Sequence, residues 1–204
     1  MMRKQLRFAV HGIGVLVFAA ALGSGCALTV DTVQLQYLAQ QGVARIEGAD
    51  KVTVAVTLTD ARTRKDRVSS KKNGYGMEMA AIVSKEDVAT LVSTAIAVEL
   101  RSRGFTVAES RVTVGIELTK FWNDFKTGFW SGSAVGEVVC NVQVKKPDGN
   151  INYVKSITGS YTEQHIQLAS GPNAKNALDG ALKDAVTKLM QDENFIKAIL
   201  QAAS

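Results

Sequence analysis

The sequence predicts an α+β fold in which a mixed, largely antiparallel sheet carries two main helices packed on one face. Two observations lead to this prediction. Segments in which apolar and polar residues alternate, typical of half-buried strands, follow one another with short connections in the second half of the chain. Two longer segments place their apolar residues on one side at helical spacing, as expected of helices that lie on a sheet.

The N-terminus has the three parts of an export signal. Basic side chains at Arg3, Lys4 and Arg7 precede an apolar run over 8–22, which ends in small residues. A helix that spans a membrane needs about 20 apolar residues, so a run of 15 residues is too short. We therefore expect residues 1–25 to direct export rather than to stay in the membrane as a helix.

Cys26 follows this run directly, and the sequence around it resembles a lipobox, at which lipoprotein precursors are acylated on cysteine and cut. The usual branched apolar residue three places before the cysteine is replaced by Gly23, and Leu22 stands one step further back. We predict lipidation of Cys26, with ordinary cleavage near 19–21 as the alternative. The chain then divides into a lipoprotein signal peptide (1–25), a lipid anchor and tether with a candidate first strand (26–50), and a single α+β domain (51–204).

Three strands are predicted in the first half of the mature chain. Alternating apolar residues indicate a short strand at 33–37 and a clearer one at 52–58. The polar stretch over 40–50 between them reads as linker or loop. A third strand at 77–83 leads into a helix.

This helix has sequence signals at both ends. We expect Ser84 to be its N-cap, with Asp87 at position N3 in a capping box, and Gly104 to end it. Glu99 falls in the middle of the apolar face. A buried, unpaired carboxylate there would be a functional candidate, but a glutamate near a helix end can also reach solvent or pair with Arg103 at i+4. We favour this second, structural role.

A basic loop separates the second and third strands. Its six cations fall within eleven residues and are opposed only by Asp66: Arg62, Arg64, Lys65, Arg67, Lys71 and Lys72. We expect a solvated loop. Contact with an anionic lipid or a glycan phosphate is the alternative.

The second half of the domain is a predicted meander followed by helices. A turn sequence at 146–150 joins two of its strands, which favours antiparallel pairing. The predicted elements are strands at 112–118, 138–144 and 151–161, an amphipathic helix at 178–189 and a short helix at 195–200.

The junction between the first two of these strands is rich in aromatic residues. Five of the thirteen aromatic side chains, including both tryptophans, lie within ten residues: Phe121, Trp122, Phe125, Phe129 and Trp130. These rings either cap the open end of the core or form an exposed tip that binds a partner or the membrane interface. We take the exposed tip as the binding hypothesis.

Catalytic and metal-binding patterns are not recognisable in the sequence. Cys140 shares a strand face with valines, so we expect a sheltered, reduced thiol. His165 is the only histidine after the signal, which leaves no set of three or four His or Cys ligands for zinc. The glycines near 132–136 form no phosphate-binding loop. We therefore predict no enzyme activity, no metal and no cofactor.

The net charge gives no reason to expect nucleic acid as a partner. The chain has a formal charge of +5. Removing the three basic side chains of the signal leaves 21 basic against 19 acidic residues. A nearly neutral mature chain lacks the basic field that nucleic-acid binding requires.

The order of these elements resembles the YajG-like family of uncharacterised envelope lipoproteins. The likeness covers about 33–200 and depends on Val-Thr-Val at 52–54 leading to Asp-Ala-Arg at 60–62, on Arg-Gly-Phe at 103–105, and on 192–195 with the helix that follows. The resemblance implies an acylated domain of the envelope without an established activity. It also implies anchoring in the outer membrane, because Ala27 replaces the aspartate that favours inner-membrane retention.

Two classes of function remain open. The first is a binding or structural accessory module, anchored to membrane lipid through Cys26, facing the periplasm from the inner leaflet of the outer membrane, with an envelope protein as partner. The second is a carrier or sensor of an amphipathic ligand between helices and sheet. That function requires a sizeable apolar pocket.

Overall fold

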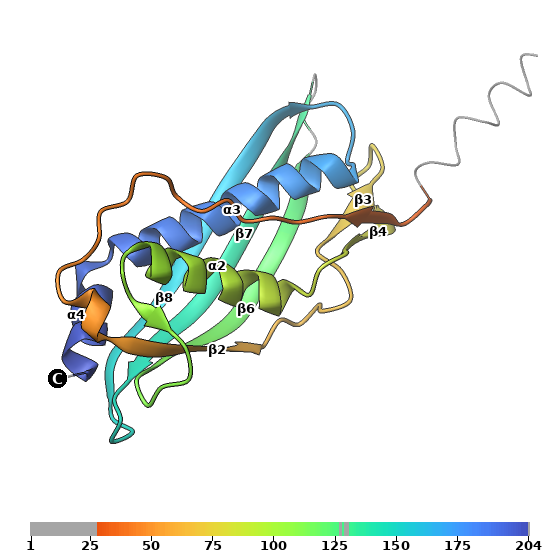
Figure 1. Cartoon of the computed structure of the whole chain (residues 1–204). Coiled ribbons are helices and arrows are strands. Elements are labelled where there is room, and N and C mark those ends of the chain that lie inside the picture. The colour runs from red at the N-terminus through yellow and green to blue at the C-terminus, as the bar shows by residue number, and fades with distance from the viewer. Residues whose placement is uncertain (1–27, 127, 129–130, 204) are drawn as a thin grey trace, which may run out of the picture.

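The computed structural model describes residues 28–126, 128 and 131–203. The signal, Cys26, Phe129 and Trp130 therefore lie outside the described residues. In chain order the elements are β1 (Asp31–Val33), η1 (Ala49–Lys51), β2 (Thr53–Asp60), β3 (Ser69–Lys72), β4 (Glu78–Ser84), α2 (Val88–Ser102), β5 (Thr106–Val107), β6 (Thr113–Lys126), β7 (Gly132–Lys145), β8 (Ile151–Ile166), α3 (Gly171–Gln191) and α4 (Glu193–Ala202). Figure 1 shows their arrangement.

The main sheet has the strand order β5-β2-β6-β7-β8. Strands β6, β7 and β8 form the predicted antiparallel meander, while β2 runs parallel to both β5 and β6. The turn at 146–150 closes through a 2.8 Å hydrogen bond that Lys146 N–H donates to the Asn150 carbonyl, with Gly149 at φ 89°. The mixed, largely antiparallel sheet is thus confirmed.

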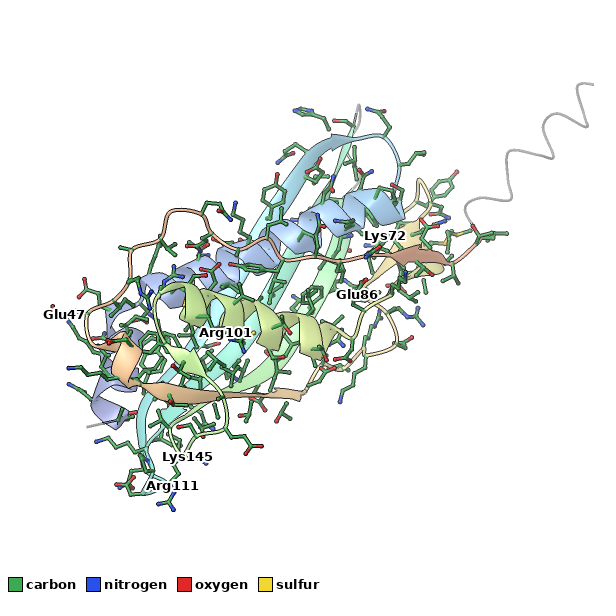
Figure 2. The ribbon with its side chains drawn as sticks, in the orientation of Figure 1. Glu47, Lys72, Glu86, Arg101, Arg111 and Lys145 are labelled. Carbon is green, nitrogen blue, oxygen red and sulfur yellow. The ribbon has the colours of Figure 1, made fainter. Side chains whose placement is uncertain are left out.

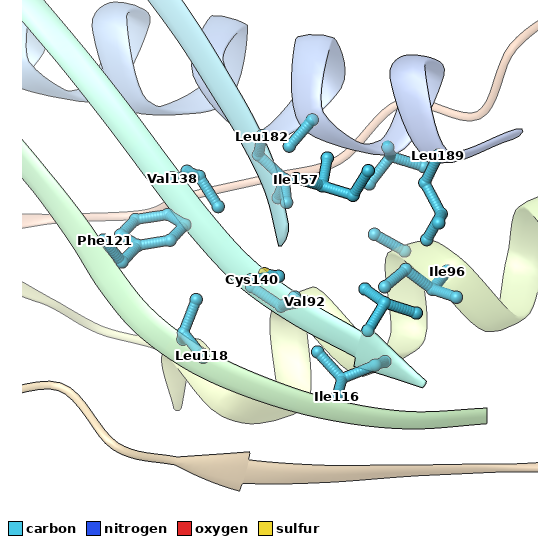
Figure 3. Packing of buried hydrophobic residues seen from close by; sticks show 14 of the residues in the cluster. Val92, Ile96, Ile116, Leu118, Phe121, Val138, Cys140, Ile157, Leu182 and Leu189 are labelled. Atoms are coloured by element: carbon cyan, nitrogen blue, oxygen red, sulfur yellow. The ribbon is translucent and has the colours of Figure 1, made fainter. Parts of the chain in front are cut away.

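Both main helices lie on the same face of this sheet (Figure 1). The buried side chains of β6, β7 and β8 meet those of α2 and α3 in one continuous core, part of which Figure 3 shows. Helix α3 approaches the sheet closely because the strands opposite it carry glycine. A Cβ at Gly136 would lie 2.1 Å from the Ala177 carbonyl oxygen, and one at Gly159 would lie 2.2 Å from that of Ala181.

The start of helix α2 corrects the sequence analysis. Ser84 was expected to cap this helix, but it is the last residue of β4 and is held there by pairing with Val33 of β1. The N-cap is instead Asp87, whose carboxylate accepts a 2.7 Å hydrogen bond from Thr90 N–H. The other end follows the prediction, since Gly104 adopts φ 104° after the C-cap Arg103.

A small second sheet with the order β1-β4-β3 lies beside β6. Its strand β3 contains Lys71 and Lys72, which the sequence analysis had placed in the basic loop. Asp31 of β1 forms an ion pair with Lys71 at 2.7 Å and accepts a 2.8 Å hydrogen bond from Gly171 N–H at the start of α3. Burial alone would raise the pKa of Asp31, but these two hydrogen bonds hold it below its ordinary value.

Residues 34–48, called the strap below, have little regular structure but lie against the domain. The strand expected at 33–37 is limited to β1, because beyond Val33 the chain leaves β4 and runs over the helices (Figure 1). Leu35 is buried, and Gln36 N–H donates a 3.0 Å hydrogen bond to Asp179 of α3.

Glu99 of α2 fastens the strap. Its carboxylate accepts 2.8 Å hydrogen bonds from the Tyr37 hydroxyl and from Gln40 N–H, and it pairs with Arg103 at i+4. The predicted pairing with Arg103 is confirmed. The Glu99 side chain does not reach solvent, because it is fully buried. Burial and the neighbouring carboxylate raise the pKa of Tyr37 well above its ordinary value. The carboxylate therefore has a structural role.

Candidate contact groove on the open face of the sheet

In strand β6, a β-bulge changes which residues point toward the helices. The register with β7 shifts by one residue at Thr119. Before the shift Ile116 and Leu118 face the helices, and after it Phe121 and Phe125 do so. A one-residue shift moves a whole strand segment to the opposite face, which is why the buried side continues at odd positions.

This shift divides the aromatic segment that was predicted to form a contact tip. Phe121 and Phe125 are 2% and 4% exposed and belong to the core, so their assignment as binding residues is corrected. Trp122 points to the opposite side and is only partly buried. Of the five rings in that hypothesis, Trp122 is the one that the described residues bring to the surface.

A groove of about 570 Å³ lies on this open face, next to Trp122. Its walls come from the 61–67 loop, from the start of β4 and from β6: Arg62, Thr63, Arg64, Glu78, Thr119, Lys120, Phe121, Trp122 and Asp124. The Arg64 guanidinium carbon stands 5.0 Å from the centroid of the Trp122 ring, within the range of a cation–π contact. Arg64 Nη1 also lies 3.1 Å from Glu78 Oε1, in an ion pair whose two side chains are exposed.

Arg62 forms the floor of the groove. Its Nε and Nη2 donate hydrogen bonds of 3.0 and 2.9 Å to the two carboxylate oxygens of Asp60. The hydrogen bonds from Arg62 lower the pKa of Asp60 below its ordinary value, so this pair stays charged at neutral pH. The remaining nitrogen, Arg62 Nη1, is buried without a hydrogen-bond partner in the described part of the chain.

The six cations that the sequence predicted for the basic loop, two of which lie in β3, carry little unpaired positive charge. Five of its six cations form ion pairs: Arg62 with Asp60, Arg64 with Glu78, Arg67 with Asp66, Lys71 with Asp31 and Lys72 with Asp124. On the groove wall Lys120 is paired in the same way with Glu137, at 2.8 Å. A surface of alternating charges fits a partner of mixed charge better than a phosphate group.

Sequence reasoning missed most of the groove. Lys120 and Asp124 alternate with Trp122 at the period of a strand, a signal that places all three on one face once the bulge is known. Glu78 could not be assigned in this way, because its position depends on how the 61–67 loop returns to the sheet.

A cavity between α2, α3 and the sheet is too small to hold a ligand. The space between helices and sheet, lined by side chains such as Val92, Cys140 and Leu182, measures about 10 Å³. Small-molecule sites usually have about 300–1,000 Å³. A carrier function therefore gains no support from this part of the structure.

The two reactive side chains singled out in the sequence, Cys140 and His165, differ in exposure. Cys140 is buried, and burial raises the pKa of its thiol to about 12. His165 is exposed and has φ 57°. In residues 28–126, 128 and 131–203, no three His, Cys, Asp or Glu side chains are grouped as metal ligands would be.

Comparison with known families identifies the chain. A family model described as uncharacterized lipoprotein matches residues 40–200. The chain belongs to this family. The match confirms the resemblance to uncharacterised bacterial lipoproteins, and membership implies association with the cell envelope. The family description names no catalytic activity. No helix in the described residues combines the length and apolarity needed to cross a membrane.

Solved structures with TM-scores above 0.5 share the fold at low sequence identity. Protein XCC0632 from Xanthomonas campestris, of family DUF330, has a TM-score of 0.56 at 12% identity, over 85% of this chain and 96% of its own. A second structure, that of an uncharacterized protein, has a TM-score of 0.53 at 10% identity, over 80% and 98%. A minor lipoprotein from Acinetobacter baumannii has a TM-score of 0.44 at 9% identity, over 71% and 94%. A search of curated protein sequences gives no match.

Proposed function

We propose that this lipoprotein is a non-catalytic binding or structural accessory module of the envelope. Acylated Cys26 holds it in the inner leaflet of the outer membrane, and the domain faces the periplasm. Its partner is another envelope protein, which it contacts through the groove beside Trp122.

The observation that carries this proposal is the pairing of Trp122 with Arg64 on the open face. Tryptophan and arginine are the residue types most enriched among the few side chains that dominate protein–protein binding energy. Here the two are preassembled at 5.0 Å and line a groove of about 570 Å³.

The charge pattern supports a protein as the partner. The groove wall carries Arg64 and Lys120 together with Glu78 and Asp124. Complementary placement of both signs gives specificity to protein interfaces. A phosphate group would meet carboxylates on the same wall.

Co-purification of the native acylated protein tests the groove. We expect Trp122→Ala and Arg64→Ala to lower recovery of the partner at least about tenfold, the effect of removing a binding hot spot. Val154→Ala is the matched control, because Val154 is 69% exposed on the same face but lies outside the groove. Unchanged recovery with both groove variants would exclude the groove as the contact surface.

Substitution of the anchor residue tests localisation separately. Cys26→Ser removes the only acceptor proposed for the acyl chains. We expect an uncut precursor or a protein released from the membrane, detected by fractionation of outer and inner membranes. A Cys26→Ser protein that is processed and membrane-bound like the natural one would refute acylation at this residue.

A further inference from the structure

The direction of the tether is fixed by the first strand. Because β1 is parallel to β4, with Asp31 opposite Ile82, the chain before Asp31 runs toward the beginning of β4 and the turn at 73–77. Asp31 itself is held by Lys71 and by Gly171 N–H. The tether therefore leaves the domain beside the β3–β4 turn (Figure 1).

Three connections meet at this end of the domain. A hollow of about 360 Å³ is lined by residues of the β3–β4 turn, of the β6–β7 connection and of the loop before α3, including Gly74, Phe125 and Leu168. The 146–150 turn lies at the opposite end of the sheet. Figure 2 shows this separation, with Lys72 at the tether end and Lys145 at the other.

The tether end exposes an unusual share of apolar surface. Six of the ten exposed large apolar side chains in the described residues lie in 28–30, in 75–79 and at 168: Leu28, Val30, Tyr75, Met77, Met79 and Leu168. Tyr75 and Leu168 are 91% and 74% exposed. The segments 73–77 and 166–170 contain no charged residue, so burying them removes no charge from water.

The short tether keeps this surface close to the anchor. Cys26 precedes Asp31 by five residues, and five residues span at most about 17 Å. If Cys26 carries the acyl chains, Asp31 stays within about this distance of the lipid surface, and the chain before Asp31 runs beside the apolar end. Tyrosine and aliphatic side chains are well suited to the boundary between headgroups and acyl chains.

We propose that this end of the domain docks on the phospholipid surface that holds its acyl chains, with Tyr75, Met77 and Leu168 entering the interface. The inference rests on acylation of Cys26, as proposed above. Docking gives the lipoprotein a second membrane contact and a fixed orientation, since an acyl anchor alone would leave the domain free to turn.

Lipid-attached quenchers test docking. The acylated full-length protein is reconstituted into phosphatidylethanolamine–phosphatidylglycerol vesicles that contain a lipid quencher near the headgroups. A fluorescent thiol label is placed by Tyr75→Cys or by Leu168→Cys, and in the control by Val154→Cys. Val154 is 69% exposed and pairs with Gln143 near the 146–150 turn, at the far end. Cys140 is buried and stays unlabelled.

We expect at least several-fold stronger quenching at 75 and 168 than at 154. Equal, weak quenching at all three positions while the protein stays on the vesicles would overturn docking and leave the acyl anchor standing. Protein that fails to stay on the vesicles would overturn acylation, and docking with it. Labels at 75 and 168 that are shielded in native membranes but unquenched in vesicles would show that a protein covers this end instead of lipid.

Discussion

The same strands form both faces of the main sheet, but one face is closely packed against helices and the other carries an open groove. On the covered face α2 and α3 leave a space of about 10 Å³. On the open face a groove of about 570 Å³ lies beside Trp122. Close packing makes the covered face sensitive to a change of a single methyl group, whereas the open face tolerates change and is free to bind. The difference separates residues that hold the fold from residues available for function.

The neighbours Phe121 and Trp122 give the sharpest test of this comparison. Phe121 is buried against the helices, so Phe121→Ala should lower the free energy of unfolding by about 3–5 kcal/mol. Trp122 faces the groove, and Trp122→Ala should change it by no more than about 1 kcal/mol. Urea unfolding of both variants measures the difference. Equal losses would mean that the Trp122 ring belongs to the core as well.

A pair of glycines extends the test to the backbone. Gly136→Ala places a methyl group against the Ala177 carbonyl, which cannot move without shifting α3, so we expect a loss of about 3 kcal/mol. Gly115 is the matched control on the open face of β6. There a Cβ meets only the flexible Gln143 side chain, at 3.1 Å. Thermal melts should show little change for Gly115→Ala, and a similar result for Gly136→Ala would contradict the close approach of α3.

On the covered face, Cys140 makes the free energy of unfolding depend on pH, and its effect per pH unit is smaller than the losses above. Burial raises the pKa of its thiol from 9.0 to about 12, so the unfolded chain loses this proton at lower pH than the folded one. The stability that depends on the neutral thiol is complete below pH 9 and falls as the pH rises toward 12. The loss is at most about 1.4 kcal/mol per pH unit.

The measurement is the slope of the free energy of unfolding against pH between about 9 and 11. Cys140→Ala should show a shallower decline than the natural protein, since it removes the titrating group. Identical slopes would indicate that the thiol is accessible to solvent in the folded state.

Much of the fold follows from local patterns. The alternation in β2, the turn at 146–150 and the apolar face of α2 identify three elements correctly because each signal lies within its own segment. The N-cap of α2 could not be predicted from local patterns. Ser84 pairs instead with Val33, which belongs to a strand about fifty residues away. The strand β3 was missed for a similar reason: Ser69–Lys72 has no apolar alternation and forms a strand by pairing with β4.

The candidate site was less predictable than the fold. The aromatic segment drew attention to Trp122, but period-two reasoning alone could not say which rings face the helices. The change from even to odd apolar positions between Leu118 and Phe121 is the sequence signal of the bulge. The partner residues Arg64 and Glu78 belong to segments whose return to β6 is set by tertiary packing.

Two contacts near the N-terminus, one of them in the strap, limit the order in which parts of the domain can fold. Gln36 bonds to Asp179, 143 residues later, and Asp31 bonds to Gly171, 140 residues later. An N-terminal segment is made first, yet these two partners belong to α3, near the end of the chain. The meander of β6, β7 and β8 needs only short loop closures, whereas these two hydrogen bonds can form only after α3 has been synthesised. A chain shortened before α3 would keep the contacts of its N-terminal segment with β4, Lys71 and Glu99 but would lose these two hydrogen bonds, so α3 completes the attachment of the first residues.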